Sequence, residues 1–111
     1  MIHIISGKAT VEEVADMLMT LKTYIKVAVD VRRRVLAGGG AMHADCESVL
    51  LDAESQQRDI WGANWYPESR EIEYQSLINI RPRRGNRSMI IVDPALREAV
   101  AGIIKERLES G

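Results

Sequence analysis

The sequence contains no phenylalanine, one cysteine and three prolines in 111 residues. Without phenylalanine, the aromatic surface consists of two tryptophans and three tyrosines, and four of these five lie between positions 61 and 74. Because Cys46 has no partner cysteine, an internal disulfide is excluded. Nothing in the composition therefore calls for an oxidising compartment.

The chain also lacks a long apolar run and an excess of charge of one sign. No stretch approaches the ~20 apolar residues that a membrane-spanning helix needs, and no basic leader precedes an apolar segment. The formal net charge of -1 argues against a nucleic-acid footprint over the whole protein. We therefore expect no membrane partner and a cytoplasmic location, with any nucleic-acid contact confined to a local basic patch.

The composition that remains is typical of one soluble domain spanning residues 1–111. Hydrophobic residues make up 46% of the chain and charged residues 28%. A chain of this size buries roughly two thirds of its unfolded surface, which is enough for a core without disulfides or metals.

Two helices are predicted, one near each end of the chain. The first spans about residues 11–21: Thr10 can cap it, Glu13 can complete a capping box, and apolar residues recur at helical spacing. The second spans about residues 94–108, where Asp93 is the predicted cap and Pro94 occupies the first helical position. Their apolar stripes indicate core packing.

Between the helices the sequence predicts short strands separated by turns. Residues 24–32 alternate in polarity and predict a half-exposed strand, and residues 71–80 alternate over a longer stretch. Shorter strands are expected at residues 2–5, 35–37, 60–66 and 89–92. With no helix expected between them, the strands predict an antiparallel meander. The fold class is therefore α+β, a mostly antiparallel sheet of five to seven strands with both helices packed on one face.

The most chemically loaded stretch is the turn that follows residues 71–80. Pro82 breaks the strand, and a Gly85-Asn86 turn is surrounded by arginines. Guanidinium forks and exposed turn amides are groups that bind phosphate or carboxylate. The candidate anion site consists of Arg81, Arg83, Arg84, Asn86 and Arg87. The alternative is a hairpin loop that carries solvated arginines.

A second candidate site is the segment of residues 43–47. If this segment is a strand, His43, Asp45 and Glu47 share one face, at a spacing that suits a divalent metal or a general base with an orienting carboxylate. Against this, the only other histidine is His3 and no zinc spacing is present. The alternative is a surface histidine beside acidic residues. Cys46 points away from that face and is most simply a small core residue.

The tryptophans form a third candidate. Trp61, Ala63 and Trp65 share one face of the strand at residues 60–66. If they are exposed, the indoles form a platform for bases or a protein contact. If they are buried, they supply the large part of a core that lacks phenylalanine. We favour burial, because soluble proteins rarely expose a wide apolar patch.

Several motifs together resemble a family of short bacterial, cyanobacterial and archaeal proteins of unknown function. These motifs are Gly38-Gly39-Gly40, Met42-His43-Ala44-Asp45-Cys46-Glu47, Trp61-Gly62 and Ile78-Asn79-Ile80-Arg81-Pro82 with Gly85-Asn86-Arg87-Ser88. The similarity covers nearly the whole chain, and the last block is the most specific. The resemblance implies a free-standing single domain, and it transfers no function to the chain. Family members tend to have Asp-Gly at Asp52-Ala53, which favours a hairpin there, and Ala53 departs from that pattern.

Three functions are compatible with these patterns. The first is an anion-binding domain for a phosphate-bearing small molecule or a nucleic acid. The second is a hydrolase that uses His43, Asp45 and Glu47, with or without a metal. The third is a structural or interaction module that forms a homodimer through a sheet edge or the tryptophan strand. The sequence identifies no cofactor.

Overall fold

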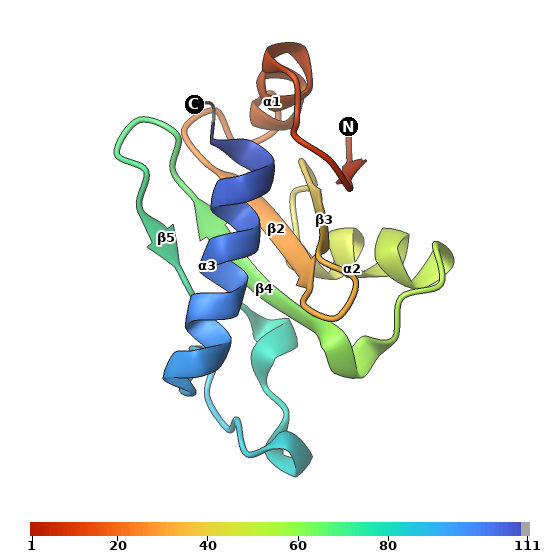
Figure 1. Ribbon diagram of the computed structural model, residues 1–111, viewed down its shortest axis with the longest axis vertical. Coiled ribbons are helices and arrows are strands. Elements are labelled where there is room, and N and C mark those ends of the chain that lie inside the picture. The colour runs from red at the N-terminus through yellow and green to blue at the C-terminus, as the bar shows by residue number, and fades with distance from the viewer. Residues whose placement is uncertain (110–111) are drawn as a thin grey trace.

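A computed structural model of the chain describes residues 1–109 and contains a five-stranded sheet with three α-helices (Figure 1). The strands are β1 His3–Ile5, β2 Ile25–Asp30, β3 Val35–Gly38, β4 Ile60–Trp65 and β5 Ile72–Glu73. Their order across the sheet is β1-β3-β2-β4-β5, and every neighbouring pair is antiparallel. The predicted α+β class is confirmed.

The two predicted helices form where the capping residues indicated. In α1, Val11–Leu18, the Glu13 amide donates to Thr10 Oγ1 at 3.0 Å, and the Thr10 amide donates to the Glu13 carboxylate at 2.9 Å. In α3, Pro94–Leu108, the Ala95 amide donates to Asp93 Oδ1 at 2.9 Å. Apolar residues of both helices join one core cluster on the same side of the sheet, as predicted.

A third helix was missed. Residues 43–47, whose candidate site required a strand, begin α2, His43–Asp52, which packs on the face of the sheet opposite α3 (Figure 1). Its buried residues are His43, Cys46, Glu47 and Leu50, which follow the helical spacing i, i+3, i+4, i+7. Two of these four residues are polar, so the sequence shows no apolar stripe that would predict this helix.

This helix changes the predicted topology in two ways. It joins β3 to β4, which lie on either side of β2, so the expected meander without a helix is wrong at this point. It also covers the second face of β2, and that strand is buried on both faces rather than half-exposed. The hairpin favoured at Asp52-Ala53 is the end of α2, after which Glu54 adopts a left-handed conformation with φ of 76°.

Small residues bring α2 close to the sheet. Ala37, Ala28 and Gly62 lie side by side on three adjacent strands, and all three are buried. The glycine run after β3 also permits a close approach: Gly39 has φ of 107°, and a Cβ there would collide with the Met1 carbonyl oxygen. The glycine run therefore serves close packing of the backbone.

The segment after β4 departs from the predicted strands. The strand expected at residues 71–80 is reduced to β5, because Ser76 Oγ accepts from the Ile78 amide at 3.2 Å and starts a 3₁₀ turn, Leu77–Asn79. The strand expected at residues 89–92 is reduced to a single bridge between Ile90 and Gln75.

The tryptophan strand is an inner strand of the sheet. Trp61 and Trp65 are 3% and 4% exposed, so their predicted burial is confirmed. Because β4 pairs with β2 on one side and β5 on the other, it offers no free edge for a homodimer.

Candidate functional site

The arginine turn closes tightly on itself. Arg81 and Asn86 form a bridge with amide-to-carbonyl distances of 2.6 and 3.1 Å, and Pro82–Arg84 make a 3₁₀ turn that ends at Gly85 with φ of 77°. The amides of Arg84, Gly85 and Asn86 all donate to carbonyls within the turn. These three amides do not face outward as expected, so they are not available to an anion.

Two buried asparagines hold the base of the turn. The Asn86 amide group donates to the carbonyls of Asn79, Ser88 and Ile90, at 2.8, 2.8 and 3.1 Å. Asn86 Oδ1 accepts from the Val92 amide at 2.9 Å. Asn79 in turn exchanges two hydrogen bonds with the backbone of Gly62, at 2.7 and 2.9 Å. The hydrogen-bonding groups of Asn86 are thus used inside the protein, and its role is to shape the turn.

Arg81 points into the protein. Its Nη2 lies 3.1 Å from Glu47 Oε2, and both side chains are 12% exposed. Its Nε donates to the Ile78 carbonyl at 3.0 Å, its Nη1 donates to the Gln57 carbonyl, and its guanidinium lies 5.0 Å from the centre of the Trp61 ring. Burial lowers the pKa of Arg81, and the Glu47 carboxylate opposes that shift. Arg81 therefore locks the turn against α2.

A groove of about 660 Å³ is lined by the Arg81–Glu47 pair and by three further arginines. Arg83 and Arg84 line it from the turn, and Arg58 lines it from the 3₁₀ turn Gln57–Asp59 that precedes β4. No ion pair or side-chain hydrogen bond among residues 1–109 involves these three guanidiniums. We refer to this region, with its apolar wall of Leu77, Ile80 and Pro82, as the arginine groove.

Sequence reasoning missed Arg58 and included Arg87. Arg58 lies more than twenty positions before the turn, and its only sequence signal is a cation in a polar segment between two elements. Arg87 is exposed but does not line the arginine groove. The fold therefore joins Arg58 to Arg83 and Arg84, while Arg87 lies outside the groove.

The three residues of the second candidate site do not converge. Because they lie on a helix, Asp45 faces solvent, Glu47 pairs with Arg81, and His43 contacts β4. No group of three or more His, Cys, Asp or Glu side chains within residues 1–109 is arranged to hold a metal ion. Cys46 is fully buried, and burial raises the pKa of its thiol, as expected of a core residue.

His43 belongs to a separate polar chain. Its Nε2 lies 3.0 Å from the Ala63 carbonyl and 2.8 Å from Asn64 Oδ1, so Nε2 is assigned the proton. Asn64 Nδ2 donates to Glu73 at 3.3 Å, and the Tyr66 hydroxyl donates to the same carboxylate at 2.7 Å, which raises the pKa of Tyr66 to about 12. Burial lowers the pKa of His43 and favours the neutral ring. A cavity of about 320 Å³ borders His43.

The sequence matches the family described as protein of unknown function (DUF5674) over residues 3–107. The chain belongs to this family. No curated protein and no solved structure matches it. The resemblance found in the motifs is thus confirmed at the level of a family of unknown function, and family membership brings no activity to the chain. Within residues 1–109, no helix is both long and apolar enough to cross a membrane.

Proposed function

We propose that this protein is a small, single-domain anion-binding protein whose ligand carries a phosphate group. The observation that supports this function is the set of three unpaired guanidiniums, Arg58, Arg83 and Arg84, around one groove. Like charges that share a groove repel one another, and a bound anion relieves that repulsion. Arginine forks also match the geometry of phosphate oxygens.

Arg81 serves this site by positioning it. Its buried pair with Glu47 and its contact with Trp61 fix the start of the turn, so that Arg83 and Arg84 project from a rigid base. The set of ligand-binding residues is therefore revised from the sequence expectation: Arg58 enters it, whereas Arg81 and Asn86 become supporting residues.

The apolar wall of the groove favours a ligand with more than an inorganic anion. Leu77 is 65% exposed and Ile80 is 43% exposed, and both lie beside the arginines. A nucleotide, free or in a nucleic-acid strand, offers phosphate to the guanidiniums and an apolar base to this wall. Free phosphate would use the cations alone.

The hydrolase and homodimer alternatives have weaker support. The side chains of His43, Asp45 and Glu47 have three different surroundings, so they form no common catalytic centre. For a dimer through strand pairing, only the short outer strands β1 and β5 are available. A cytoplasmic location fits the single buried cysteine.

The test is fluorescence anisotropy with a short labelled single-stranded oligonucleotide, followed by competition with ATP and with inorganic phosphate. If three arginines contact phosphate, the logarithm of the binding constant falls with the logarithm of the salt concentration with a slope of about -2. Each of Arg58→Ala, Arg83→Ala and Arg84→Ala is expected to weaken binding several-fold and to reduce that slope by about 1.

The matched control is Arg87→Ala, which removes a guanidinium from the same turn but outside the groove. Its affinity is expected to stay close to that of the unmodified protein. The proposal fails if no probe binds at low salt, or if Arg87→Ala weakens binding as much as Arg84→Ala. Competition by ATP but not by phosphate supports the role of the apolar wall, and equal competition by both removes it.

A further inference from the structure

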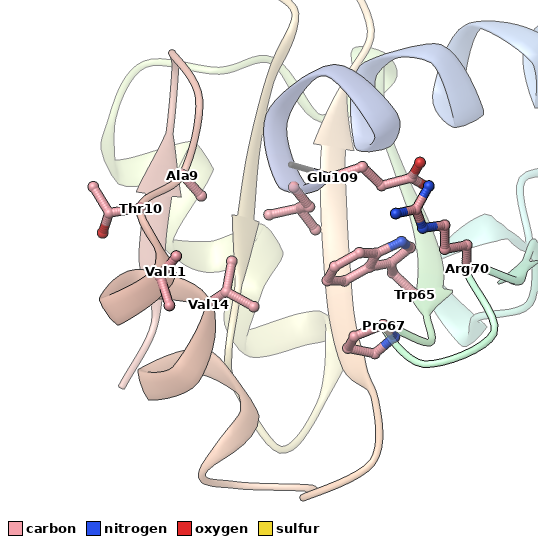
Figure 2. A pocket seen from close by; sticks show the side chains of 9 residues that line it. Ala9, Thr10, Val11, Val14, Trp65, Pro67, Arg70 and Glu109 are labelled. Atoms are coloured by element: carbon pink, nitrogen blue, oxygen red, sulfur yellow. The ribbon is translucent and has the colours of Figure 1, made fainter. Parts of the chain in front are cut away.

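A second pocket lies at the other end of the protein, where α1, α3 and the loop between β4 and β5 meet (Figure 2). Its volume is about 240 Å³, and it shares no lining residue with the arginine groove. Ligands of drug size occupy pockets of about 300–1,000 Å³, so this pocket suits a smaller molecule.

Two of the residues that line this pocket each carry a buried polar atom without a hydrogen-bond partner. These atoms are Trp65 Nε1 and Glu109 Oε2, and within residues 1–109 they are the only buried side-chain nitrogen or oxygen atoms in this state. Trp65 is 4% exposed, and Figure 2 shows its indole nitrogen on the side of the ring that faces Arg70 and Glu109. Leaving such an atom unpaired destabilises the folded state. Two of them on residues of one pocket indicate a polar ligand.

The same pocket carries one charge of each sign. Arg70 comes from the loop between β4 and β5, where it has φ of 64° and its amide donates to the Tyr66 carbonyl at 2.7 Å. Glu109 comes from the end of α3. Figure 2 shows the two side chains near each other, yet they are absent from the ion pairs formed by residues 1–109. Both charges are thus available to a ligand.

The other residues that line the pocket are either apolar or have hydrogen-bonding groups that are already paired. Val11, Val14, Pro67 and Leu108 supply its apolar surface. Thr10 also lines it, but the capping box between Thr10 and Glu13 satisfies amides at the start of α1. Thr10 Oγ1 and the Thr10 and Glu13 amides are therefore already engaged, and the candidate anion-binding groups are Arg70 and the Trp65 N–H.

We propose that this pocket binds a free α-amino acid with an apolar side chain. The ligand carboxylate accepts from Trp65 Nε1 and Arg70, and the ligand ammonium group donates to Glu109. The apolar side chain lies against Val11, Val14 and Leu108. An amino acid of this kind offers a carboxylate to the two donors, Trp65 and Arg70, and an ammonium group to the acceptor, Glu109. Its apolar side chain fits the apolar wall of this small pocket. This site is separate from the arginine groove and does not depend on its function.

The test follows the two indole N–H signals in nitrogen–proton correlation spectra of the full chain during titration with L-leucine. The Trp65 signal is expected to shift saturably, and the Trp61 signal, which reports on the other end of β4, is expected to stay in place. N-acetyl-L-leucine lacks the ammonium group and L-leucinamide lacks the carboxylate. Each is expected to bind at least ten-fold more weakly than L-leucine.

Variants assign the charges. Glu109→Gln is expected to weaken L-leucine binding while leaving the weak binding of N-acetyl-L-leucine unchanged. Arg70→Gln is expected to weaken L-leucine binding while leaving the weak binding of L-leucinamide unchanged. Arg84→Ala, in the arginine groove, serves as the control and leaves the titration unaltered. The proposal is overturned if L-leucine leaves the Trp65 signal in place at millimolar concentration. It is overturned equally if all three compounds bind alike, since the pocket would then recognise only apolar surface.

Discussion

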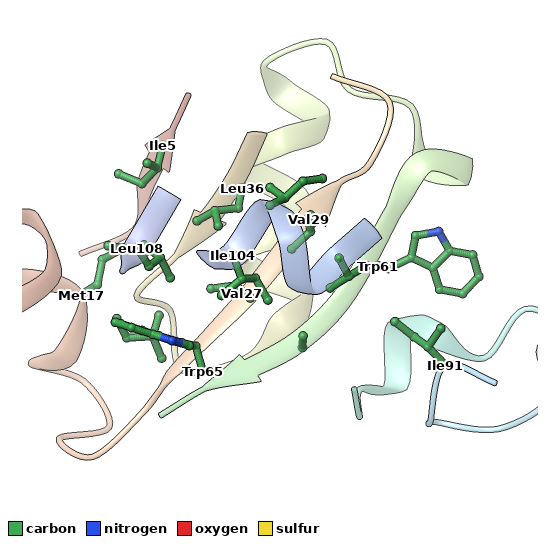
Figure 3. Packing of buried hydrophobic residues seen from close by; sticks show 14 residues of the cluster. Ile5, Met17, Val27, Val29, Leu36, Trp61, Trp65, Ile91, Ile104 and Leu108 are labelled. Atoms are coloured by element: carbon green, nitrogen blue, oxygen red, sulfur yellow. The ribbon is translucent and has the colours of Figure 1, made fainter. Parts of the chain in front are cut away.

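The face of the sheet under α3 is filled by large apolar side chains, whereas the face under α2 rests on small residues and holds buried polar groups. Under α3, Val27, Val29 and Leu36 from the strands meet Ile104 and Leu108 from the helix (Figure 3). Under α2, the apolar cluster contains five buried residues, among them Ala28 and Ala37. His43, Glu47, Asn64 and Asn79 lie on or beside it.

This difference means that one face provides most of the stability of the fold, while the other face positions the arginine turn. Burial of apolar surface is non-directional and contributes about 25 cal/mol per Å², so the α3 face can supply most of the folding free energy without fixing any one group. Hydrogen bonds and ion pairs are directional. Those on the α2 face, from Glu47 to Arg81 and from Asn79 to Gly62, fix the turn that carries the arginine groove. The candidate site therefore depends on the face that has the less extensive apolar core.

The largest expected effect on the α2 face comes from Glu47→Ala. It leaves the Arg81 guanidinium buried without its carboxylate, and losing one partner of a buried pair costs about 3–5 kcal/mol. Urea denaturation measures the loss. The exposed neighbour Asp45→Ala is the control and is expected to change the free energy of unfolding by less than about 0.5 kcal/mol.

A double variant sharpens this prediction. Replacing Glu47 by Leu and Arg81 by Met removes both charges, and most of the stability is expected to return because no unpaired charge stays buried. Binding at the arginine groove is expected to remain impaired, since the turn has lost its anchor. Equal losses in Glu47→Ala and Asp45→Ala would mean that the pair does not stabilise the fold.

A smaller effect on stability is expected from adding one methyl group at Gly62, on the α2 face of the sheet, and one at Gly102, within α3. A Cβ at Gly62 would lie 2.5 Å from Ser76 Cβ and 2.6 Å from Ser76 Oγ, so Gly62→Ala is expected to destabilise the protein by about 1–3 kcal/mol. A Cβ at Gly102, within α3, meets nothing within 4 Å. Gly102→Ala is expected to stabilise the protein by about 1 kcal/mol, because alanine is the better helix former. Thermal unfolding of both variants gives the signs, and a stabilising effect of Gly62→Ala would contradict the close packing on the α2 face.

The smallest effect concerns pH and His43. Burial lowers the pKa of His43 in the folded state, and the nearby Lys26 adds to the shift, so the unfolded chain binds a proton more readily. Stability is therefore complete above the unfolded pKa of about 6.5 and falls as the pH drops below it, by at most about 1.4 kcal/mol per pH unit. His43→Gln is expected to flatten this dependence in urea titrations between about pH 7 and 5.

The elements that local signals specify were predicted correctly. Thr10 with Glu13 and Asp93 with Pro94 start their helices through contacts within a few residues, and alternation of polarity marked the strand that contains Val27. The same signal in residues 71–80 predicted a strand of which only Ile72–Glu73 forms. Helix α2 was missed because its buried face includes His43 and Glu47, whose partners come from distant segments. Polar residues on a buried face cancel the periodicity that sequence reading relies on.

The candidate site was predicted only in part, for the same reason. The cluster of arginines beside Gly85 marked the turn, but nothing local separates Arg81, whose guanidinium pairs with Glu47, from Arg83 and Arg84, which form no such pair. Nor could the pattern add Arg58 or exclude Arg87, because their places depend on how two loops meet.

The sequence by itself determined the fold class, the starts of α1 and α3, the burial of the two tryptophans and the position of the arginine turn. These follow from capping, periodicity and the need to bury large side chains, which act over a few residues or on composition. Only the tertiary structure decided that Glu47 neutralises Arg81, that Arg58 joins the groove, and that Trp65 and Glu109 share a pocket. These are pairings between distant residues, and their geometry exists only once the chain has folded.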